Sequence, residues 1–471
     1  MASTTPFQSH VVIFPFMAQG HTLPLLDLSK ALSHKQIKVT IITTPGNSNS
    51  ISRKVSSFPH ISITEIPFPT AAVSGLPSGC ENTSQLPSMD LHFNFVLATK
   101  HLQKPFTEVL QKMVQSSEFP PICVISDFFL GWTLAVCEAL GVPRLVFHGM
   151  GVLSMAISKT AWVHKPHLKT TSVNDPVELP GLKLPFSLTS SDLPEFLMME
   201  EDDPFVKLIE EIGMTDAKSW GIVMNSFEEL ERSHIQSFEA FYFAGAKAWC
   251  LGPLFLYSIS DEFDRENSIF QWLNNKTTPN FVIYVSFGTQ AEVSESQLNE
   301  IAYGLEESGY QFIWVLRSKT WNFPIGLEEK KIGERGLIVR EFVDQRRILS
   351  HRAIGGFLSH CGWNSVLESV SAGVPILGWP MIAEQGLNAK LIVEGLGAGV
   401  GLKRDGGRRD ICDGVREIMG GEKGRIARER AEALGRVARR AVQKGGSSDD
   451  TLNKMIEQLR IESDKKLQYR S

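Results

Sequence analysis

Short runs of apolar residues alternate with amphipathic stretches through most of the chain. Each run is nearly continuous in β-branched and aromatic residues, which is typical of strands that are covered on both faces of a parallel sheet. In the first half, strands are predicted at 10–16, 37–43, 61–68, 122–126, 144–148, 220–226 and 247–252. Helices are predicted between them, at 22–34 and 91–116 among others. This alternation predicts a doubly wound α/β domain.

A polar stretch without hydrophobic periodicity, at 253–268, separates this series from a second one. The second series has predicted strands at 281–288, 311–317, 336–342, 354–360 and 374–379. Its predicted helices are 294–308, 363–372, 384–395, 410–419 and 424–443, followed by a last helix at about 447–463.

The two series predict two facing α/β domains. We expect an N-terminal domain at 1–252, a linker at 253–268, a C-terminal domain at 269–446, and a C-terminal helix within 447–471 that packs back on the N-terminal domain. Such folds bind ligands at the carboxyl ends of their strands, so the expected site is a cleft between the domains.

Composition narrows the class of protein. The hydrophobic fraction of 42% is that of a soluble globular protein, and the net charge of −5 gives no reason to expect nucleic acid as a partner. No apolar segment is long enough to span a membrane, and no secretory signal precedes the first strand. The six cysteines lack C-x-x-C spacing, which argues against a disulfide framework and a zinc site. We expect a cytoplasmic monomer.

The segment HCGWNSVLES, at 360–369, combines a glycine turn with the start of a helix. Gly362 allows the chain to turn after the strand, and the first helical amides then lack partners and carry the positive end of the helix dipole. Those amides form a natural phosphate cradle. Further contacts are expected from the side chains of His360, Asn364 and Ser365. A plain helix cap is the alternative interpretation of this segment alone.

Neighbouring residues extend the phosphate cradle into a larger site. Glu368 would repel a bare phosphate, but it can accept hydrogen bonds from ribose hydroxyls. Glu384 and Gln385 begin the next helix and are suited to adjacent hydroxyls of a hexose. The strand at 281–288 brings three more residues to the same sheet edge, namely Ser286, Gly288 and Thr289. Together these residues predict a site for a nucleotide sugar.

Residues 342–385 resemble the signature box of plant UDP-dependent glycosyltransferases of specialised metabolism. The match includes ILSHRAIGGFLSHCGWNSVLESVSAGVPILGWPMIAEQ almost throughout. The resemblance extends to FPFMAQGHTLPLLDLSKAL near the start, ISDFF at 125–129, NSFEELE at 225–231 and YVSFGT at 284–289. It implies the GT-B fold, which consists of two facing Rossmann-like domains.

The resemblance also assigns roles to the residues of the box. His360 and Ser365 match diphosphate ligands, Glu368 matches the ribose ligand, and Trp363, Glu384 and Gln385 match positions that contact the hexose. Gln385 at the end of the box goes with UDP-glucose as the donor. The UDP-sugar site is thus expected to comprise Ser286, Gly288, Thr289, Phe342, Val343, Gln345, His360, Gly362, Trp363, Asn364, Ser365, Glu368, Glu384 and Gln385. Two positions depart from the family: Phe342 replaces the tryptophan that stacks on uracil, and Asp344 replaces a proline.

The catalytic base implied by the resemblance is His21, in the loop after the first strand, and Asp127 is its partner. The chemistry agrees, because a histidine can take the proton of a weakly nucleophilic hydroxyl and a carboxylate can orient the imidazole. Without the family, a helix cap is the first interpretation of each residue alone, and their shared location at the carboxyl ends of strands in one sheet is what supports the pair. His148 also follows a strand and is a lower-ranked alternative to His21.

The predicted reaction is an inverting, metal-independent transfer of a hexose, most simply glucose, to a hydroxyl of a small lipophilic metabolite such as a flavonoid, another phenol or a terpenoid. No D-x-D tripeptide occurs, so no metal is expected, and the donor is the only cofactor-like ligand. The acceptor is expected near the segments 74–95 and 147–156.

Three alternatives remain beside this reaction. Transfer to carbon of a phenolic ring and non-catalytic binding of a nucleotide sugar stay open. A dinucleotide-dependent oxidoreductase is disfavoured because the first strand does not lead into G-x-G-x-x-G.

Overall fold

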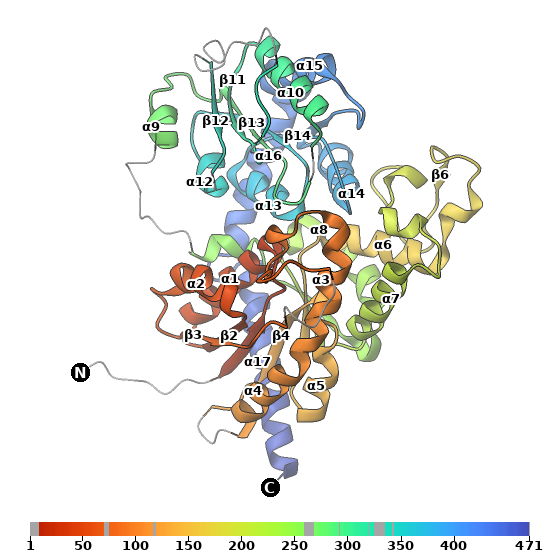
Figure 1. The fold of residues 1–471 in the computed structure, drawn as a ribbon, viewed down its shortest axis with the longest axis vertical. Helices are drawn as coiled ribbons and strands as arrows, with labels where there is room; N and C mark the ends of the chain where they lie inside the picture. The colour runs from red at the N-terminus through yellow and green to blue at the C-terminus, as the bar shows by residue number, and fades with distance from the viewer. Residues whose placement is uncertain are drawn as a thin grey trace. The chain divides into compact units, whose positions relative to one another are not determined.

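The computed structural model describes residues 9–69, 75–115, 119–258, 268–291, 293–318, 320–324, 335–341 and 343–470. The chain divides into two units (Figure 1). The first unit consists of Met1–Met155, Met199–Ile259 and Ala441–Ser471, and the second of Ala156–Met198 and Ser260–Arg440. Residues 156–198 therefore group with the second unit, although they lie inside the predicted N-terminal domain. The predicted domain limits stay a prediction.

The first unit is built on a seven-stranded parallel sheet with the order β3-β2-β1-β4-β5-β8-β9. The strands are β1 (His10–Phe14), β2 (Lys38–Thr43), β3 (Ile61–Glu65), β4 (Cys123–Asp127), β5 (Arg144–His148), β8 (Gly221–Met224) and β9 (Lys247–Cys250). Ile13 of β1 pairs with Ile41 of β2 on one side and with Ile125 of β4 on the other. The strand order reverses between β1 and β4, which is the position where such sheets bind ligands.

Helices cover the first sheet and connect its strands. They are α1 (Gln19–His34), α2 (Pro45–Val55), α3 (His92–Thr99), α4 (Gln103–Gln115), α5 (Thr133–Leu140), α7 (Pro204–Ala217), α8 (Glu228–Glu239) and α17 (Ser447–Arg470), while α6 (Val152–His164) runs from the first unit into the second. The single helix predicted at 91–116 is wrong, because a 3₁₀ turn at Lys100–Leu102 divides α3 from α4. Pro105 explains the break, since it has no amide hydrogen to continue a regular helix.

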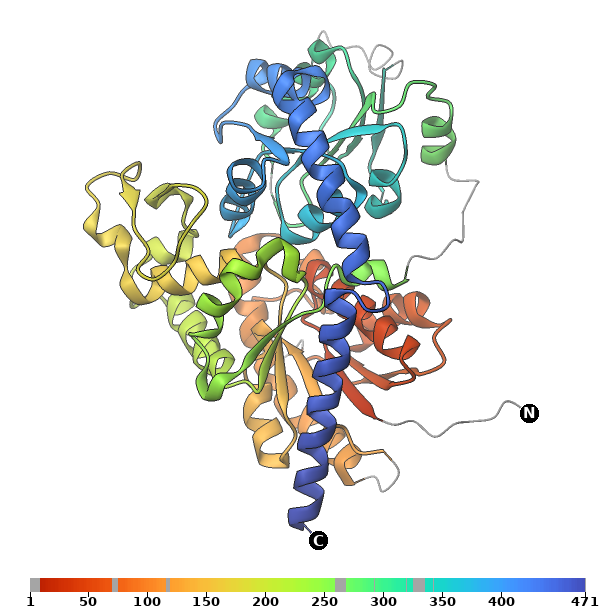
Figure 2. The same cartoon turned by 180° about the vertical axis from the view of Figure 1, so that it is seen from behind.

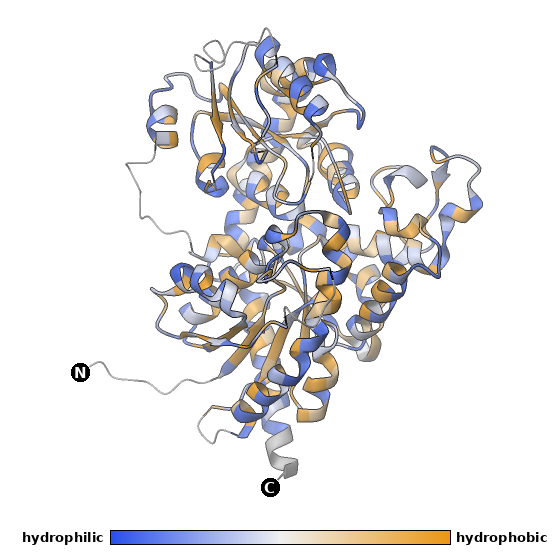
Figure 3. Cartoon of the chain, viewed as in Figure 1, coloured by the Kyte–Doolittle hydropathy of each residue, from blue (hydrophilic) through white to orange (hydrophobic). Residues whose placement is uncertain are grey.

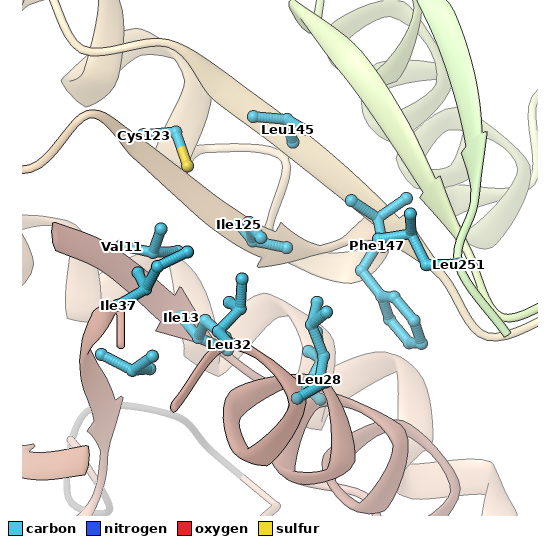
Figure 4. Packing of buried hydrophobic residues seen from close by; sticks show 14 of the residues in the cluster. Val11, Ile13, Leu28, Leu32, Ile37, Cys123, Ile125, Leu145, Phe147 and Leu251 are labelled. Atoms are coloured by element: carbon cyan, nitrogen blue, oxygen red, sulfur yellow. The ribbon is translucent and has the colours of Figure 1, made fainter. Parts of the chain in front are cut away.

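The core of the first unit lies between the sheet and its helices (Figure 4). Helix α17 contributes a stripe at i, i+3, i+4 and i+7, consisting of Leu452, Met455, Ile456 and Leu459. Polar contacts hold the start of the same helix, where Lys35 Nζ lies 2.6 Å from Asp449 Oδ1 and Ser448 Oγ donates to Gly252 O at 2.6 Å. Figure 2 shows α17 crossing this unit. Leu254 is also fully buried in this core, so the apolar packing continues into the predicted linker.

The second unit contains a six-stranded parallel sheet with the order β12-β11-β10-β13-β14-β15. Its strands are β10 (Val282–Ser286), β11 (Gln311–Val315), β12 (Gly336–Val339), β13 (Ile354–Ser359), β14 (Ile376–Gly378) and β15 (Gly399–Gly401). Its helices are α9 (Ser268–Asn274), α10 (Glu295–Ser308), α12 (Gln345–Leu349), α13 (Trp363–Ala372), α14 (Gln385–Lys390), α15 (Arg408–Gly420) and α16 (Glu422–Ala441). A separate antiparallel pair is formed by β6 (Pro176–Val177) and β7 (Leu188–Thr189).

Apolar side chains are concentrated in the strands of both sheets, which are mostly orange in Figure 3. Strand β15 was not predicted, because Gly-Val-Gly offers one apolar side chain and no periodicity. The helix predicted at 384–395 is shorter than expected, since α14 ends at Lys390 and a π-helical turn follows at Leu391–Gly395. Among the described residues, no helix is both long and apolar enough to cross a bilayer.

Candidate active site

His21 lies at the carboxyl end of the first sheet, on the first turn of α1. Strand β1 ends at Phe14, and the chain enters the helix at Gln19, so His21 projects from the helix start. Its Nδ1 lies 2.8 Å from Asp127 Oδ2, across 106 residues of sequence. The His21 side chain is 23% exposed, whereas that of Asp127 is completely buried. The imidazole is therefore anchored by a buried carboxylate while part of its ring stays accessible.

Asp127 is fixed on both carboxylate oxygens. It is the last residue of β4, and its Oδ1 accepts a hydrogen bond from the Phe129 amide at 3.0 Å, which caps a short 3₁₀ helix. Oδ2 is left to accept the hydrogen of His21 Nδ1, because an ionised carboxylate has no hydrogen to donate. This arrangement selects the His21 tautomer in which Nε2 carries the lone pair.

A buried arginine, which the sequence analysis missed, lies behind Asp127. Arg144 is 2% exposed, and its guanidinium donates to Ser126 Oγ at 2.8 Å, Ser219 Oγ at 2.8 Å and the Asp127 carbonyl at 3.2 Å. Burial lowers the pKa of Arg144, and the negative charges of Asp216 and Asp127 oppose that shift. The guanidinium thus holds the end of β4 and brings positive charge to the buried side of the site. A charged residue at the start of an apolar strand was the only signal in the sequence.

His148, the alternative base, forms a second pair with Asp216. His148 Nε2 lies 2.9 Å from Asp216 Oδ1, and both side chains are 0–1% exposed. Tyr242 closes this cluster, since its hydroxyl donates to Asp216 Oδ2 at 2.9 Å. Burial and the charge of Asp216 raise the pKa of Tyr242 well above its ordinary value, so the hydroxyl keeps its hydrogen. A substrate cannot reach His148 in this arrangement.

In the second unit, the turn between β13 and α13 brings His360 against two glycines. A Cβ added at Gly362 would lie 2.5 Å from His360 Nε2, and one added at Gly288 would lie 2.7 Å from it. Only glycine therefore fits at either position without displacing the imidazole. Burial lowers the pKa of His360 to about 4, with the Ser286 backbone opposing the shift. His360 is thus a neutral hydrogen-bonding group at the mouth of α13.

Helix α13 begins at Trp363, where the sequence predicts a phosphate-binding site. Gly362 is the N-cap and has no side chain that could form a capping bond. The preceding turn is held by Asn388, whose Nδ2 donates to Cys361 O at 3.0 Å. Asn364 is half-buried at this start, whereas the Trp363 side chain is only 2% exposed and packs in the interior.

Glu368 lies one turn further along α13 and is part of a hydrogen-bond network. Its Oε2 accepts from Gln345 Nε2 at 2.7 Å, and its Oε1 lies 2.9 Å from Arg346 Nε. The Gln345 amide also donates to Ser365 Oγ at 3.0 Å and accepts from Tyr284 OH at 3.1 Å. The predicted diphosphate and ribose ligands are therefore joined through Gln345. Arg346 was not predicted, although it balances the charge of Glu368.

Of the two positions that depart from the family pattern, Asp344 is described by the structure and Phe342 is not. Asp344 is the N-cap of α12, and its Oδ1 accepts from the Arg347 amide at 3.2 Å. An aspartate can thus begin this helix where a proline would otherwise do so. Phe342 lies outside the described residues. Val343, next to it, is 9% exposed and belongs to a hydrophobic core of the second unit.

The remaining predicted residues lie at the start of α14 and at the end of β10, with Thr289 in the loop that follows β10. Gln385 is 7% exposed, and its Oε1 accepts from the amides of Met381 and Ile382 at 3.0 Å each. Within the described residues, no acceptor contacts its amide nitrogen, which can therefore serve as a donor. Glu384 is half-buried, and its Oε1 accepts from Asn388 Nδ2 at 3.3 Å. Ser286 ends β10, whereas Thr289 is exposed in the loop that follows. In the part of the chain that the structure describes, no group of three or more His, Cys, Asp or Glu residues is arranged to hold a metal ion.

Two family models match the chain, one on each half. The model described as UDP-glucoronosyl and UDP-glucosyl transferase matches residues 267–428, and that of the glycosyltransferase N-terminal domain matches residues 8–256. Together they include the His21–Asp127 pair and the N-terminus of α13.

Known proteins agree with these matches over nearly their whole length. The chain is 37% identical to UDP-glycosyltransferase 73B4 of Arabidopsis thaliana and to scopoletin glucosyltransferase of Nicotiana tabacum, with 96% of this chain and 98% of each relative covered. The crystal structure of UGT73P12 of Glycyrrhiza uralensis, complexed with glycyrrhetinic acid 3-O-monoglucuronide, matches with a TM-score of 0.87 and 30% identity over 98% of both chains. These similarities confirm the GT-B fold class. The chain belongs to the family of plant UDP-glycosyltransferases.

Proposed function

We propose that this UDP-glycosyltransferase transfers glucose from UDP-glucose to a hydroxyl of a small lipophilic acceptor, with inversion at the anomeric carbon. The observation that carries the proposal is the His21–Asp127 pair, at 2.8 Å, in which the carboxylate is buried and the imidazole is partly accessible. This is the arrangement that general-base activation of a hydroxyl requires.

The reaction balances in a single displacement. His21 Nε2 takes the acceptor proton while the acceptor oxygen forms a bond to the anomeric carbon. The bond from that carbon to the UDP oxygen breaks at the same time, and its electron pair leaves with the diphosphate. Asp127 stabilises the imidazolium that results. A retaining route would need an enzyme carboxylate as nucleophile, and no residue of the predicted site has that role.

The leaving diphosphate is assigned to the N-terminus of α13. Helix amides and the neutral His360 donate hydrogen bonds to it, and the helix dipole favours its negative charge. This electrostatic environment provides the stabilisation that a bridging cation supplies in other enzymes, so the transfer is expected to be metal-independent.

The remaining donor contacts follow the hydrogen-bond network of the second unit. Glu368 and Gln345 are assigned to the ribose hydroxyls, and Glu384 and Gln385 to those of the hexose. In this assignment the ribose replaces Gln345 or Arg346 as a donor to Glu368. Phe342 is assigned to uracil, where a phenyl ring can stack on the base.

The acceptor class is inferred from relatives and from the sequence. Relatives of this chain are named for their action on scopoletin and on a flavonoid, the latter being UDP-glucose flavonoid 3-O-glucosyltransferase 7 of Fragaria ananassa, at 35% identity. The half-buried ring of Phe129, which packs beside His21, suits a flat apolar acceptor.

The proposal is tested by incubating the protein with UDP-glucose and a panel of flavonoids, coumarins, triterpenoids and simple phenols. We expect UDP release that depends on the acceptor, persists in excess EDTA, and yields a β-glucoside by proton NMR. An α-glucoside, a carbon-linked product, or activity that EDTA abolishes and Mg²⁺ restores would contradict it.

A further inference from the structure

A second imidazole lies beside the proposed base. His92 is the first residue of α3, 71 positions after His21 in the sequence, and both rings pack against Phe16 and Phe129. The His21 centroid lies 5.6 Å from Phe16 and 5.5 Å from Phe129, and the His92 centroid lies 6.0 Å and 5.6 Å from the same two rings. Since the two phenyl rings are 5.0 Å apart, the imidazoles share one aromatic support.

The hydrogen-bonding capacity of His92 is not used within the described part of the chain. None of the described residues donates or accepts a hydrogen bond at its ring, and neither nitrogen is among the buried polar atoms that lack a partner. The residue as a whole is half-buried. Its nitrogens are thus accessible to a small molecule that lies beside His21.

The charge state of His92 suits a neutral ligand. Burial, and to a smaller extent the charge of the nearby His21, lowers its pKa to about 4. At neutral pH the ring therefore has one N–H donor and one nitrogen acceptor. If the position required packing alone, a phenyl ring would fill it against two phenyl rings without the cost of placing a polar group there.

We propose that His92 is a specificity residue that hydrogen-bonds a second acceptor oxygen next to the hydroxyl that His21 deprotonates. The enzyme then favours acceptors with two adjacent oxygens on a flat ring, such as a catechol. One oxygen reaches His21 Nε2 and the other reaches His92, while the half-buried Phe129 supports the acceptor ring and the fully buried Phe16 holds the two imidazoles from behind. This inference rests on the proposed function, because it uses the same acceptor position.

The test compares two coumarins with UDP-glucose: umbelliferone has one hydroxyl, and esculetin has a second hydroxyl next to the first. The quantity measured is the ratio of kcat/KM for esculetin to that for umbelliferone. A neutral hydrogen bond corresponds to a preference of roughly three- to ten-fold. We expect His92→Phe to lower the ratio by that factor and His92→Gln, which keeps a donor and an acceptor, to restore part of it.

The matched control is His101→Phe, which makes the same change at an exposed histidine in the turn after α3 and should leave the ratio unchanged. If His92→Phe fails to fold, His92→Leu removes both nitrogens and serves the same comparison. An unchanged ratio in a folded variant overturns the role of His92 while leaving the proposed function intact.

If the wild-type protein glucosylates neither coumarin, the proposed function fails for this class. Calorimetric titration of each coumarin into wild type and His92→Phe then measures the same preference without turnover, and equal preferences overturn the inference.

Discussion

Two histidine–aspartate pairs lie at the carboxyl ends of neighbouring strands in the first sheet, and they differ in access rather than in geometry. His21 and Asp127 are 2.8 Å apart, and His148 and Asp216 are 2.9 Å apart. The His21 side chain is 23% exposed, whereas that of His148 is completely buried. A short contact between an imidazole and a carboxylate therefore does not identify a catalytic base, and only the accessible pair can meet a substrate.

The surroundings of the two pairs explain this difference. Tyr242 covers Asp216, so the second pair is part of a closed polar cluster that joins β5 to α7. The first pair has its carboxylate in the interior and its imidazole at the start of a helix. Arg144 lies between the two, because it donates to the Asp127 carbonyl and its charge interacts with that of Asp216. We infer a catalytic role for the first pair and a stabilising role for the second.

The largest expected effect that separates the pairs is on turnover. His21→Ala should lower kcat by about 10²–10⁴-fold, because general-base catalysis contributes that much. The matched variant His148→Ala should lower kcat by less than about ten-fold per active site. Turnover should be measured with UDP-glucose and normalised to the number of sites that bind UDP. An equal loss of kcat in both variants would show that the two pairs do not differ in their catalytic role.

Asp127 provides the next test, because its two oxygens have different partners. In Asp127→Asn, the amide of Phe129 still requires an acceptor at Oδ1, so the carboxamide nitrogen should face His21. That nitrogen would donate to Nδ1 and fix the wrong tautomer. We expect Asp127→Ala to lower kcat by roughly 10–10³-fold and Asp127→Asn to be at least as damaging. A nearly active Asp127→Asn would show that the tautomer of His21 is not controlled by this contact.

The free energy of unfolding should be lowered more by His148→Ala than by His21→Ala, which is the reverse of the effect on kcat. His148→Ala leaves the buried carboxylate of Asp216 without one of its partners, which should lower the free energy of unfolding by about 3 kcal/mol. His21→Ala removes a partly exposed ring and should cost about 1 kcal/mol or less. Urea denaturation followed by fluorescence measures both. A His148 variant as stable as the wild type would mean that the closed cluster has no structural role.

The last effect concerns the pH dependence of stability and His10, which has no carboxylate partner among the described residues. His10 is 2% exposed and contacts Thr40 Oγ1 at 2.8 Å and Phe119 O at 3.0 Å, and burial lowers its pKa to about 4. Because its ordinary pKa of 6.5 applies in the unfolded chain, protons bind the unfolded state first. The contribution of the neutral His10 to the free energy of unfolding is therefore complete above pH 6.5 and is lost as the pH falls toward 4. At pH 5 the free energy of unfolding should be lower by about 2 kcal/mol. His10→Gln should flatten that dependence in urea denaturation, and an unchanged slope would contradict the assignment.

Local patterns in the sequence were sufficient to predict most strands and the mouth of α13. Continuous apolar runs predicted the buried strands of both sheets, and the glycine before Trp363 predicted the helix start that follows β13. These features depend on neighbouring residues, so they are visible without tertiary structure. Strand β15 and the break between α3 and α4 are not visible in this way. A short glycine-rich strand has too few apolar residues to show a periodicity, and one proline does not fix where a helix breaks.

The polar partners could not be predicted in the same way. Asp216 is 68 residues from His148, and nothing local marks it as a partner. The position of His92 beside His21 also results from the fold, since both rings pack against Phe16 and Phe129. Such contacts join residues that are distant in sequence, and one sequence contains no signal for them.

The most direct test of the catalytic assignment compares His21→Ala and wild type across acceptors of decreasing acidity, from a nitrophenol through a simple phenol to an aliphatic alcohol. An acidic phenol loses its proton with little help, whereas an alcohol needs a base in the transition state. If His21 is that base, the loss of kcat in His21→Ala should grow steadily as the pKa of the acceptor rises. A loss that is the same for all three acceptors would show that His21 positions the acceptor without removing its proton, and the account of the first pair would be wrong.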